Sequence, residues 1–269
     1  MLEKIIETTE FLKAKGINNP DAGIILGTGL GELTTKIQNR IEIDYKDIPN
    51  FPLSTVEGHA GKLIYGVFGG KKIVAMKGRF HYYEGYTQEQ VALPVRVLKY
   101  LGIKCLFLSN AAGGVNPAFH IGDIMVITDH ISLLSNPLIG PNDDRIGTRF
   151  PDMGEAYDKR LIDKALHFAE ENNIRIHKGV YLSTSGPTFE TPAEYKYFRI
   201  IGADAVGMST TPEVIVARHM NLPCFALSVI TDLGVEGKIE YTTHESVQNE
   251  AAKTESRMTT IMTEMISTL

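Results

Sequence analysis

Residues 23–33 join a short apolar run to several closely spaced glycines, after which a helix is expected. Glycine lets backbone amides approach an anion, and the hydroxyl of Thr28 adds a further donor. A dinucleotide-binding loop would need glycine where this chain has Glu32, and no Gly-Lys-Ser/Thr follows to make a nucleoside-triphosphate loop. The segment therefore predicts a small-anion site that includes Thr28. A plain glycine turn is the alternative interpretation.

A second set of side chains follows the apolar run at residues 72–76. Arg79, His81 and Tyr83 alternate there, so a continued extended backbone would turn all three to one side. They lie at the carboxyl edge of the predicted sheet, where α/β proteins bind ligands. Arginine offers a planar fork to phosphate or carboxylate, and histidine can donate or titrate. The alternative is an ion pair of Arg79 with Glu84, with the aromatic rings in the core.

Three further segments could enclose a ligand. Small residues at 110–114 would leave room against bare backbone amides, unless they only form a tight turn between a strand and a helix. Phe189 and Glu190 suit a planar heterocycle with N–H donors, whereas a solvated surface position is the alternative for Glu190. Ser209 or Thr210 could line the same site or merely cap the helix that follows.

The sequence contains no spacing typical of a metal site or of an activated nucleophile. Its eight histidines form no HxxxH, HExxH or Cys/His cluster, and there is no Gly-x-Ser-x-Gly turn. Cys105 and Cys224 lie in apolar runs without the basic surroundings that lower a thiol pKa. An enzyme with this sequence would work by positioning and electrostatics, without a metal or a covalent intermediate.

Composition narrows the class of protein. The chain has 269 residues, and 27 Lys+Arg against 32 Asp+Glu leave a net charge of −5, which argues against a nucleic-acid partner. No apolar stretch approaches the roughly 18 to 20 residues of a membrane span. Glu3, Glu7 and Glu10 do not fit a secretory signal, and the cysteines are expected to be reduced. We expect a cytoplasmic protein without a membrane partner.

Apolar runs typical of buried strands alternate with helical patterns along the chain, and no linker or repeat interrupts them. The sequence predicts a single α/β domain over residues 1–269, with a mixed, largely parallel central sheet flanked by helices. The irregular segment 134–154 is long enough to be functional. Strands are expected at 23–26, 62–68, 72–76, 105–108, 124–128, 179–183, 203–206 and 224–230, and helices at 1–16, 87–101, 157–171, 192–201, 211–220 and 244–266.

Taken together, the motifs resemble those of the trimeric, low-molecular-mass purine nucleoside phosphorylase family. The resemblance implies a pentosyltransferase of purine salvage. Its reversible reaction converts a purine nucleoside and orthophosphate into free base and (deoxy)ribose 1-phosphate, with no cofactor beyond the phosphate co-substrate. It also implies a homotrimer. The matching segments, in the family's order, are ILGTGLG, EGHAG, GRFHYYEGY, NAAGG, RFPDM, GPTFETPAE and GADAVGMSTTPEVIVARH.

The same resemblance assigns roles to individual residues. Candidate catalytic side chains are His81, Glu190, Asp232 and His244, and Phe150 would reach the active site of a neighbouring subunit. The phosphate ligands would be Thr28, His59, Arg79, His81, the Ala111 amide and Ser209, and the nucleoside contacts Tyr83, Ala112, Phe150, Phe189, Glu190, Val206, Gly207, Met208, Asp232 and His244.

Asp232 departs from the family pattern, which usually has asparagine facing N7 and O6 of a 6-oxopurine. An ionised Asp232 would repel O6, whereas a protonated one could donate to N7. Relatives with aspartate here favour 6-amino bases but usually lack a residue like Glu190. We therefore expect phosphorolysis mainly of inosine and guanosine, with a preference for adenosine or 5′-methylthioadenosine as the alternative. A non-catalytic nucleoside-sensing module, from another class, would not need phosphate ligands beside the ribose.

Overall fold

The computed structural model describes residues 1–28, 30–53, 55 and 61–269. Its strands form one nine-stranded mixed sheet in the order β2-β3-β4-β1-β5-β8-β7-β6-β9, with β9 also paired to β5. The strands β5, β8, β7, β6 and β9 therefore close on themselves, and β2, β3, β4 and β1 extend the sheet from β5. The strands are β1 Ala22–Leu26, β2 Gln38–Asp44, β3 Lys62–Phe68, β4 Lys71–Lys77, β5 Cys105–Gly114, β6 Ile124–Ser132, β7 Ile176–Ser183, β8 Ala205–Gly207 and β9 Cys224–Leu233.

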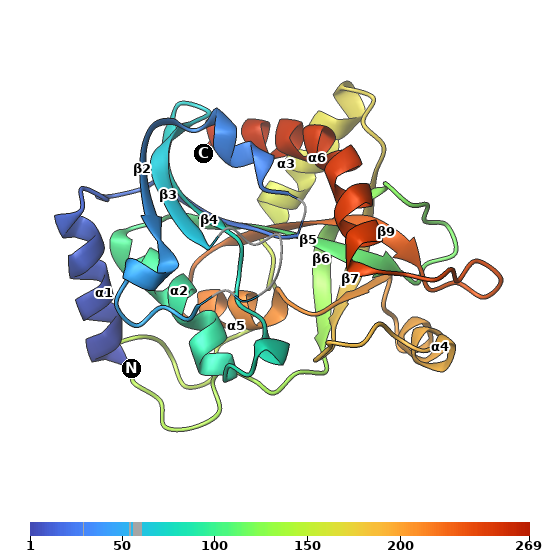
Figure 1. Cartoon of the computed structure of the whole chain (residues 1–269), viewed down its shortest axis with the longest axis horizontal. Coiled ribbons are helices and arrows are strands. Elements are labelled where there is room, and N and C mark those ends of the chain that lie inside the picture. The colour runs from blue at the N-terminus through green and yellow to red at the C-terminus, as the bar shows by residue number, and fades with distance from the viewer. Residues whose placement is uncertain (29, 54, 56–60) are drawn as a thin grey trace.

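The helices cover both sides of this sheet. In Figure 1, α3 and α6 lie together above the sheet, and α2 and α5 lie below it, with α1 beside α2. Among the described residues, no helix has the length and apolar character needed to cross a bilayer. The helices are α1 Leu2–Ala14, α2 Gln88–Leu101, α3 Lys159–Glu171, α4 Pro192–Ile200, α5 Thr211–His219 and α6 His244–Ser267.

Side-chain caps set where several helices begin. Thr87 accepts a hydrogen bond from Gln90 N at the start of α2, and Thr243 accepts one from Ser246 N at the start of α6. Asp158 accepts from two backbone N–H groups of the first turn of α3. The cap at Thr243 fixes where α6 begins, and therefore where His244 lies.

The strands that position the site run in one direction. β1 pairs in parallel with β4 and with β5, and β5 pairs in parallel with β9. β1 is buried along its whole length, as its uninterrupted apolar sequence predicts. The carboxyl ends of these four strands therefore meet at one edge of the sheet.

The structure corrects two sequence-based predictions and refines a third. β2 was not predicted, because this edge strand is largely exposed and its polar residues show no apolar pattern. The segment 110–114 is not a turn: it continues β5, where small residues allow pairing with both β8 and β9. The glycine segment is followed by a short 3-10 helix, Glu32–Lys36, rather than by an α-helix. The fold class itself, a mixed α/β sheet flanked by helices, is confirmed.

Candidate active site

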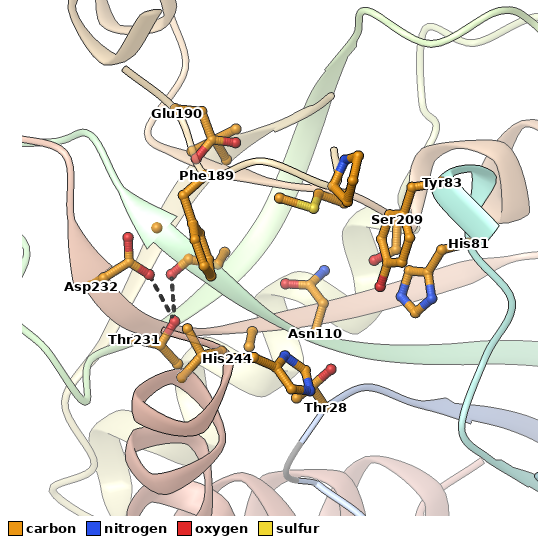
Figure 2. Close-up of a pocket in the computed structure, with 18 of the residues that line it drawn as sticks. Thr28, His81, Tyr83, Asn110, Phe189, Glu190, Ser209, Thr231, Asp232 and His244 are labelled. Atoms are coloured by element: carbon orange, nitrogen blue, oxygen red, sulfur yellow. Dashed lines mark hydrogen bonds between the residues drawn. The ribbon is translucent and has the colours of Figure 1, made fainter. Parts of the chain in front are cut away.

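A cavity of ≈ 310 Å³ opens at the carboxyl ends of β1, β4, β5 and β9. Figure 2 shows Glu190 and Asp232 on one side of it and His81, Tyr83 and Ser209 on the other. It brings together residues from most of the motifs singled out in the sequence. The lining residues are Thr28, Arg79, His81, Tyr83, Asn110, Ala111, Ala112, Gly113, Pro187, Phe189, Glu190, Val206, Gly207, Met208, Ser209, Thr231, Asp232, His244 and Val247.

Arg79 lines this cavity, and its side chain is 2% exposed. Its Nε lies 3.1 Å from Glu213 Oε1, its Nη1 donates to Ser109 O at 2.7 Å, and the same Nη1 donates to Ser209 Oγ at 3.2 Å. The alternative partner considered from the sequence, Glu84, was therefore wrong. Glu213 and the Ser109 carbonyl hold the guanidinium beside Ser209, which places a fixed cation next to a hydroxyl.

His81 pairs with Glu84 instead. Its Nδ1 lies 3.2 Å from Glu84 Oε2, and its backbone N donates to the same oxygen at 2.7 Å. Burial lowers the pKa of His81, against the opposing effect of Glu84, so the ring is neutral near pH 7. Burial raises the pKa of Glu84, but hydrogen bonds from His81 and Thr55 outweigh it and bring that pKa to about 2. An ionised Glu84 accepts from Nδ1–H, which makes Nε2 the acceptor of the neutral ring.

The backbone after Arg79 does not continue as a strand. A 3-10 turn, Tyr82–Glu84, replaces the extended conformation on which the predicted alternation depended. Tyr83 nevertheless lines the cavity, and its ring stacks on His81 with centroids 4.7 Å apart at 14°. The three side chains are thus gathered by the turn and by ring stacking.

Helix capping does not explain the residues before α5. Thr210 is the N-cap residue but makes no side-chain cap hydrogen bond, and its φ is 70°. Its hydroxyl instead accepts from Asn110 Nδ2 at 2.8 Å and lies 3.1 Å from Ser209 Oγ. The capping-only interpretation was therefore wrong, and this network directs Ser209 toward the cavity.

Two carboxyl groups form the other side of the cavity. Burial raises the pKa of Asp232 and that of Glu190, and the nearby Asp232 charge raises the pKa of Glu190 further. Thr231 Oγ1 donates to Asp232 Oδ1 at 3.0 Å, and Tyr195 Oη lies 3.4 Å from Asp232 Oδ2. The surface interpretation of Glu190 was wrong, because Glu190 is half-buried and lines the cavity.

Several lining residues were missed from the sequence. A side chain at Gly113 would bring Cβ within 2.8 Å of Asp232 Oδ2, so glycine allows this carboxylate to approach β5. Tyr195, which does not line the cavity, was missed as the partner of Asp232 because its phenol reaches Asp232 from another part of the chain. Thr231 directly precedes Asp232, and this adjacency is the local signal that could have found it. The other lining residues not assigned to the site from the sequence are Pro187, Val247 and Asn110, the last of which lies in the segment 110–114 singled out above.

Two predicted residues are not part of the described cavity. His59 lies outside the described residues. Phe150 does not line the cavity of its own chain, and its side chain is 86% exposed beside the Arg149 guanidinium. Over the described ranges, no three His, Cys, Asp or Glu side chains are grouped so as to hold a metal ion.

Replacing Glu213 by alanine should lower the free energy of unfolding by about 3–5 kcal/mol, because it leaves the Arg79 guanidinium buried without its carboxylate. Glu213→Gln keeps an acceptor oxygen and should cost less. Denaturant titrations at fixed protein concentration measure both, with the exposed Glu236→Ala as control. A Glu213→Ala variant as stable as the Glu236 control would contradict this role of the pair.

Comparisons with known proteins agree in one family. Residues 21–267 match the model of the phosphorylase superfamily. The chain is 52% identical over 244 residues to purine nucleoside phosphorylase 1 of Geobacillus stearothermophilus, covering 90% of this chain and 89% of that protein. Schistosoma mansoni purine nucleoside phosphorylase in complex with inosine superposes with a TM-score of 0.94 at 41% identity, covering 99% and 96% of the two chains. The same enzyme in complex with adenosine gives 0.93 at 42% identity, covering 99% and 97%.

Proposed function

The chain belongs to the purine nucleoside phosphorylases of the phosphorylase superfamily and catalyses phosphorolysis of purine nucleosides, and from that premise we propose that inosine and guanosine are its main substrates. One observation carries the proposal. One side of a single cavity carries hydroxyls, with the Arg79 guanidinium hydrogen-bonded to Ser209, and the other side carries two carboxyl groups beside an aromatic ring. The first side suits an oxyanion, and the second suits a purine with N–H donors.

Orthophosphate is the co-substrate, and no other cofactor is proposed. Arg79 supplies the charge and Ser209 a hydroxyl held 3.2 Å from the guanidinium. A neutral His81 with Nδ1 turned to Glu84 presents Nε2 as an acceptor, which suits the O–H of a phosphate monoanion or a sugar hydroxyl. The remaining proposed phosphate ligands are Thr28, the Ala111 amide and His59, the last outside the described residues.

The nucleoside lies across the rest of the cavity. Tyr83, Met208 and His244, which line the cavity, are the proposed ribose contacts. Phe189 offers a ring face to the base, with Ala112, Val206 and Gly207 as the other proposed base contacts.

Bond cleavage passes through an oxocarbenium-like sugar between the leaving base and the incoming phosphate. The phosphate oxygens stabilise that cation, while Arg79 and the backbone amides hold the anion in line. The base leaves with developing negative charge, which a hydrogen bond or a proton at N7 reduces. Lowering the activation free energy by about 1.4 kcal/mol, by stabilising either the sugar cation or the leaving base, raises the rate tenfold.

Base preference depends on which form each carboxyl group takes. An ionised Glu190 accepts from N1–H of a 6-oxopurine, and a protonated Asp232 donates to N7. Burial raises the pKa of Asp232, which favours its protonated form; burial raises the pKa of Glu190 as well, and hydrogen bonds from its own backbone N–H, Tyr195 and Thr184 favour the ionised form of Glu190. A preference for 6-amino bases is the second candidate, since an ionised Asp232 could accept from an exocyclic amino group. The Schistosoma mansoni enzyme, which has been solved with inosine and with adenosine, is consistent with some tolerance of adenosine here.

A substrate panel at fixed phosphate tests the proposal. Inosine and guanosine should be cleaved with kcat/KM at least about tenfold above that of adenosine or methylthioadenosine, because N1–H matches an ionised Glu190. Base release should depend strictly on added phosphate. A strong preference for adenosine would reject the 6-oxopurine assignment, and release without phosphate would indicate a hydrolase.

The homotrimer and the cytoplasmic location are proposed from fewer observations than the substrate. The exposed Phe150 would enter the cavity of a neighbouring copy in a homotrimer, as the family resemblance implies. Buried free thiols at Cys105 and Cys224 suit a cytoplasmic protein of purine salvage. Light scattering that finds a fully active monomer would reject the trimer.

A further inference from the structure

The long helix α6 carries a buried carboxylate that does not line the active-site cavity. Glu255 is 5% exposed, and its Oε1 accepts hydrogen bonds from Glu32 N at 2.6 Å and from Leu33 N at 3.3 Å. These amides open the 3-10 helix Glu32–Lys36, whose N-cap, Gly31, has no side chain to cap it. Glu255 therefore supplies from a distant helix the cap that the local sequence lacks.

The same segment is held at its other end by β5. Gly27 N lies 3.3 Å from Ser109 Oγ, and a Cβ at Gly27 would lie only 2.7 Å from Ser109 O. Thr28, which lines the cavity, follows directly after this contact. One anchor thus precedes Thr28, and Glu255 provides the other shortly after it.

Burial and a few neighbouring groups determine the direction in which the pKa of Glu255, the second anchor, is shifted. Burial raises the pKa of Glu255, and the Glu32 carboxylate adds to this effect. The two backbone hydrogen bonds and the charge of Lys77 act in the opposite direction. Hydrogen bonds from amides to a buried carboxylate are among the stronger ones, so this contact can hold a short segment in place.

The contact also revises the interpretation of the glycine segment. The amides of Glu32 and Leu33 bind an internal carboxylate, so they are not the amides offered to a substrate anion. The residue of this segment that lines the cavity is Thr28, which precedes Glu32 in the sequence. The first turns of α6 contribute His244 and Val247 to the same cavity. Helix α6 therefore contributes His244 and Val247 to the cavity wall directly, and through Glu255 it also contacts the segment that follows Thr28.

We propose that Glu255 is a positioning residue for orthophosphate, acting through the segment that carries Thr28; this inference rests on the proposed function. Loss of the contact should weaken phosphate binding and leave nucleoside binding almost unchanged, because Glu255 touches neither the base nor the ribose contacts. A purely structural role would instead lower the melting temperature and the active fraction without separating the two KM values.

Two conservative variants distinguish the effect of the position of the Glu255 carboxylate oxygen from the effect of its charge. Glu255→Asp keeps the charge but withdraws the oxygen from the amides, and should raise KM for phosphate about 10-fold while KM for inosine changes less than about 2-fold. Glu255→Gln keeps the oxygen in reach and should stay within about 3-fold of the wild-type KM for phosphate. Glu264→Ala, further along α6, is the matched control. KM is independent of the amount of active protein, so partial loss of folded enzyme does not obscure the result.

The outcomes are distinguishable. Wild-type enzyme that cleaves inosine without phosphate would overturn the proposed function. Wild-type enzyme that needs phosphate, together with a Glu255→Asp variant whose KM for phosphate is unchanged, would overturn the positioning role alone. Equal increases in both KM values would also overturn it, because they would indicate a general distortion of the cavity.

Discussion

Replacing Arg79 by alanine is expected to lower kcat/KM for phosphate by about 10³-fold at saturating inosine. The guanidinium is the buried cation of the cavity nearest to Ser209, and its hydrogen bonds to Ser109 O and Ser209 Oγ fix its direction. Without it, the buried Glu213 carboxylate behind the cavity wall would be left without its cation and would repel the phosphate. Arg79→Lys keeps the charge but loses the planar fork, and should cost about 10²-fold.

Initial rates with varied phosphate measure this effect, and two controls isolate it. The double variant Arg79→Ala with Glu213→Ala removes the unpaired carboxylate, so any remaining loss belongs to the missing guanidinium. Arg40→Ala removes an exposed arginine on the edge strand β2 and should leave the kinetics unchanged. A loss below about 5-fold in the double variant would mean that Arg79 has no part in phosphate binding.

Replacing Asp232 by asparagine is expected to raise the ratio of kcat/KM for inosine to that for adenosine by about 10- to 100-fold. The asparagine amide donates to N7 or O6 at any pH, whereas the aspartate donates only when protonated. The substitution also removes a charge that raises the pKa of Glu190. The ratio is measured with both nucleosides at fixed phosphate. Asp163→Asn, on the exposed face of α3, is the control, and an unchanged ratio would mean that Asp232 does not face the base.

The pH profile provides a second readout for the same substitution. Because burial raises the pKa of Asp232, its protonated form persists to higher pH than in an ordinary aspartate. Wild-type kcat/KM for inosine should therefore fall as pH rises through that pKa, and the asparagine variant should lack this fall. At the acid side, protonation of Glu190 removes the acceptor for N1–H; Asp232 is already protonated and neutral there, so this limb should stay in place in the variant. Identical profiles would contradict the role given to Asp232.

Sequence patterns predicted the strands that are surrounded by apolar side chains on both faces. β1 and β4 are buried on both faces, and their continuous apolar runs mark them clearly. β2 was not predicted, because an exposed edge strand needs no apolar alternation. The extension of β5 through Gly114 escaped because small residues are equally typical of turns, and only pairing with β8 and β9 makes them a strand.

By itself, the sequence determined which residue types stand at the strand ends, and so the candidates for phosphate and base contacts. Arg79 and Glu190 were found this way because each lies within a few residues of a strand or turn that its own neighbours specify, whereas Asp232 was identified only through the family resemblance. Only the tertiary structure decided their partners. Arg79 pairs with Glu213, 134 residues away, and Glu32 N with Glu255, 223 residues away. Such pairs form only when strand order and helix packing bring distant segments together, and no local pattern encodes that packing.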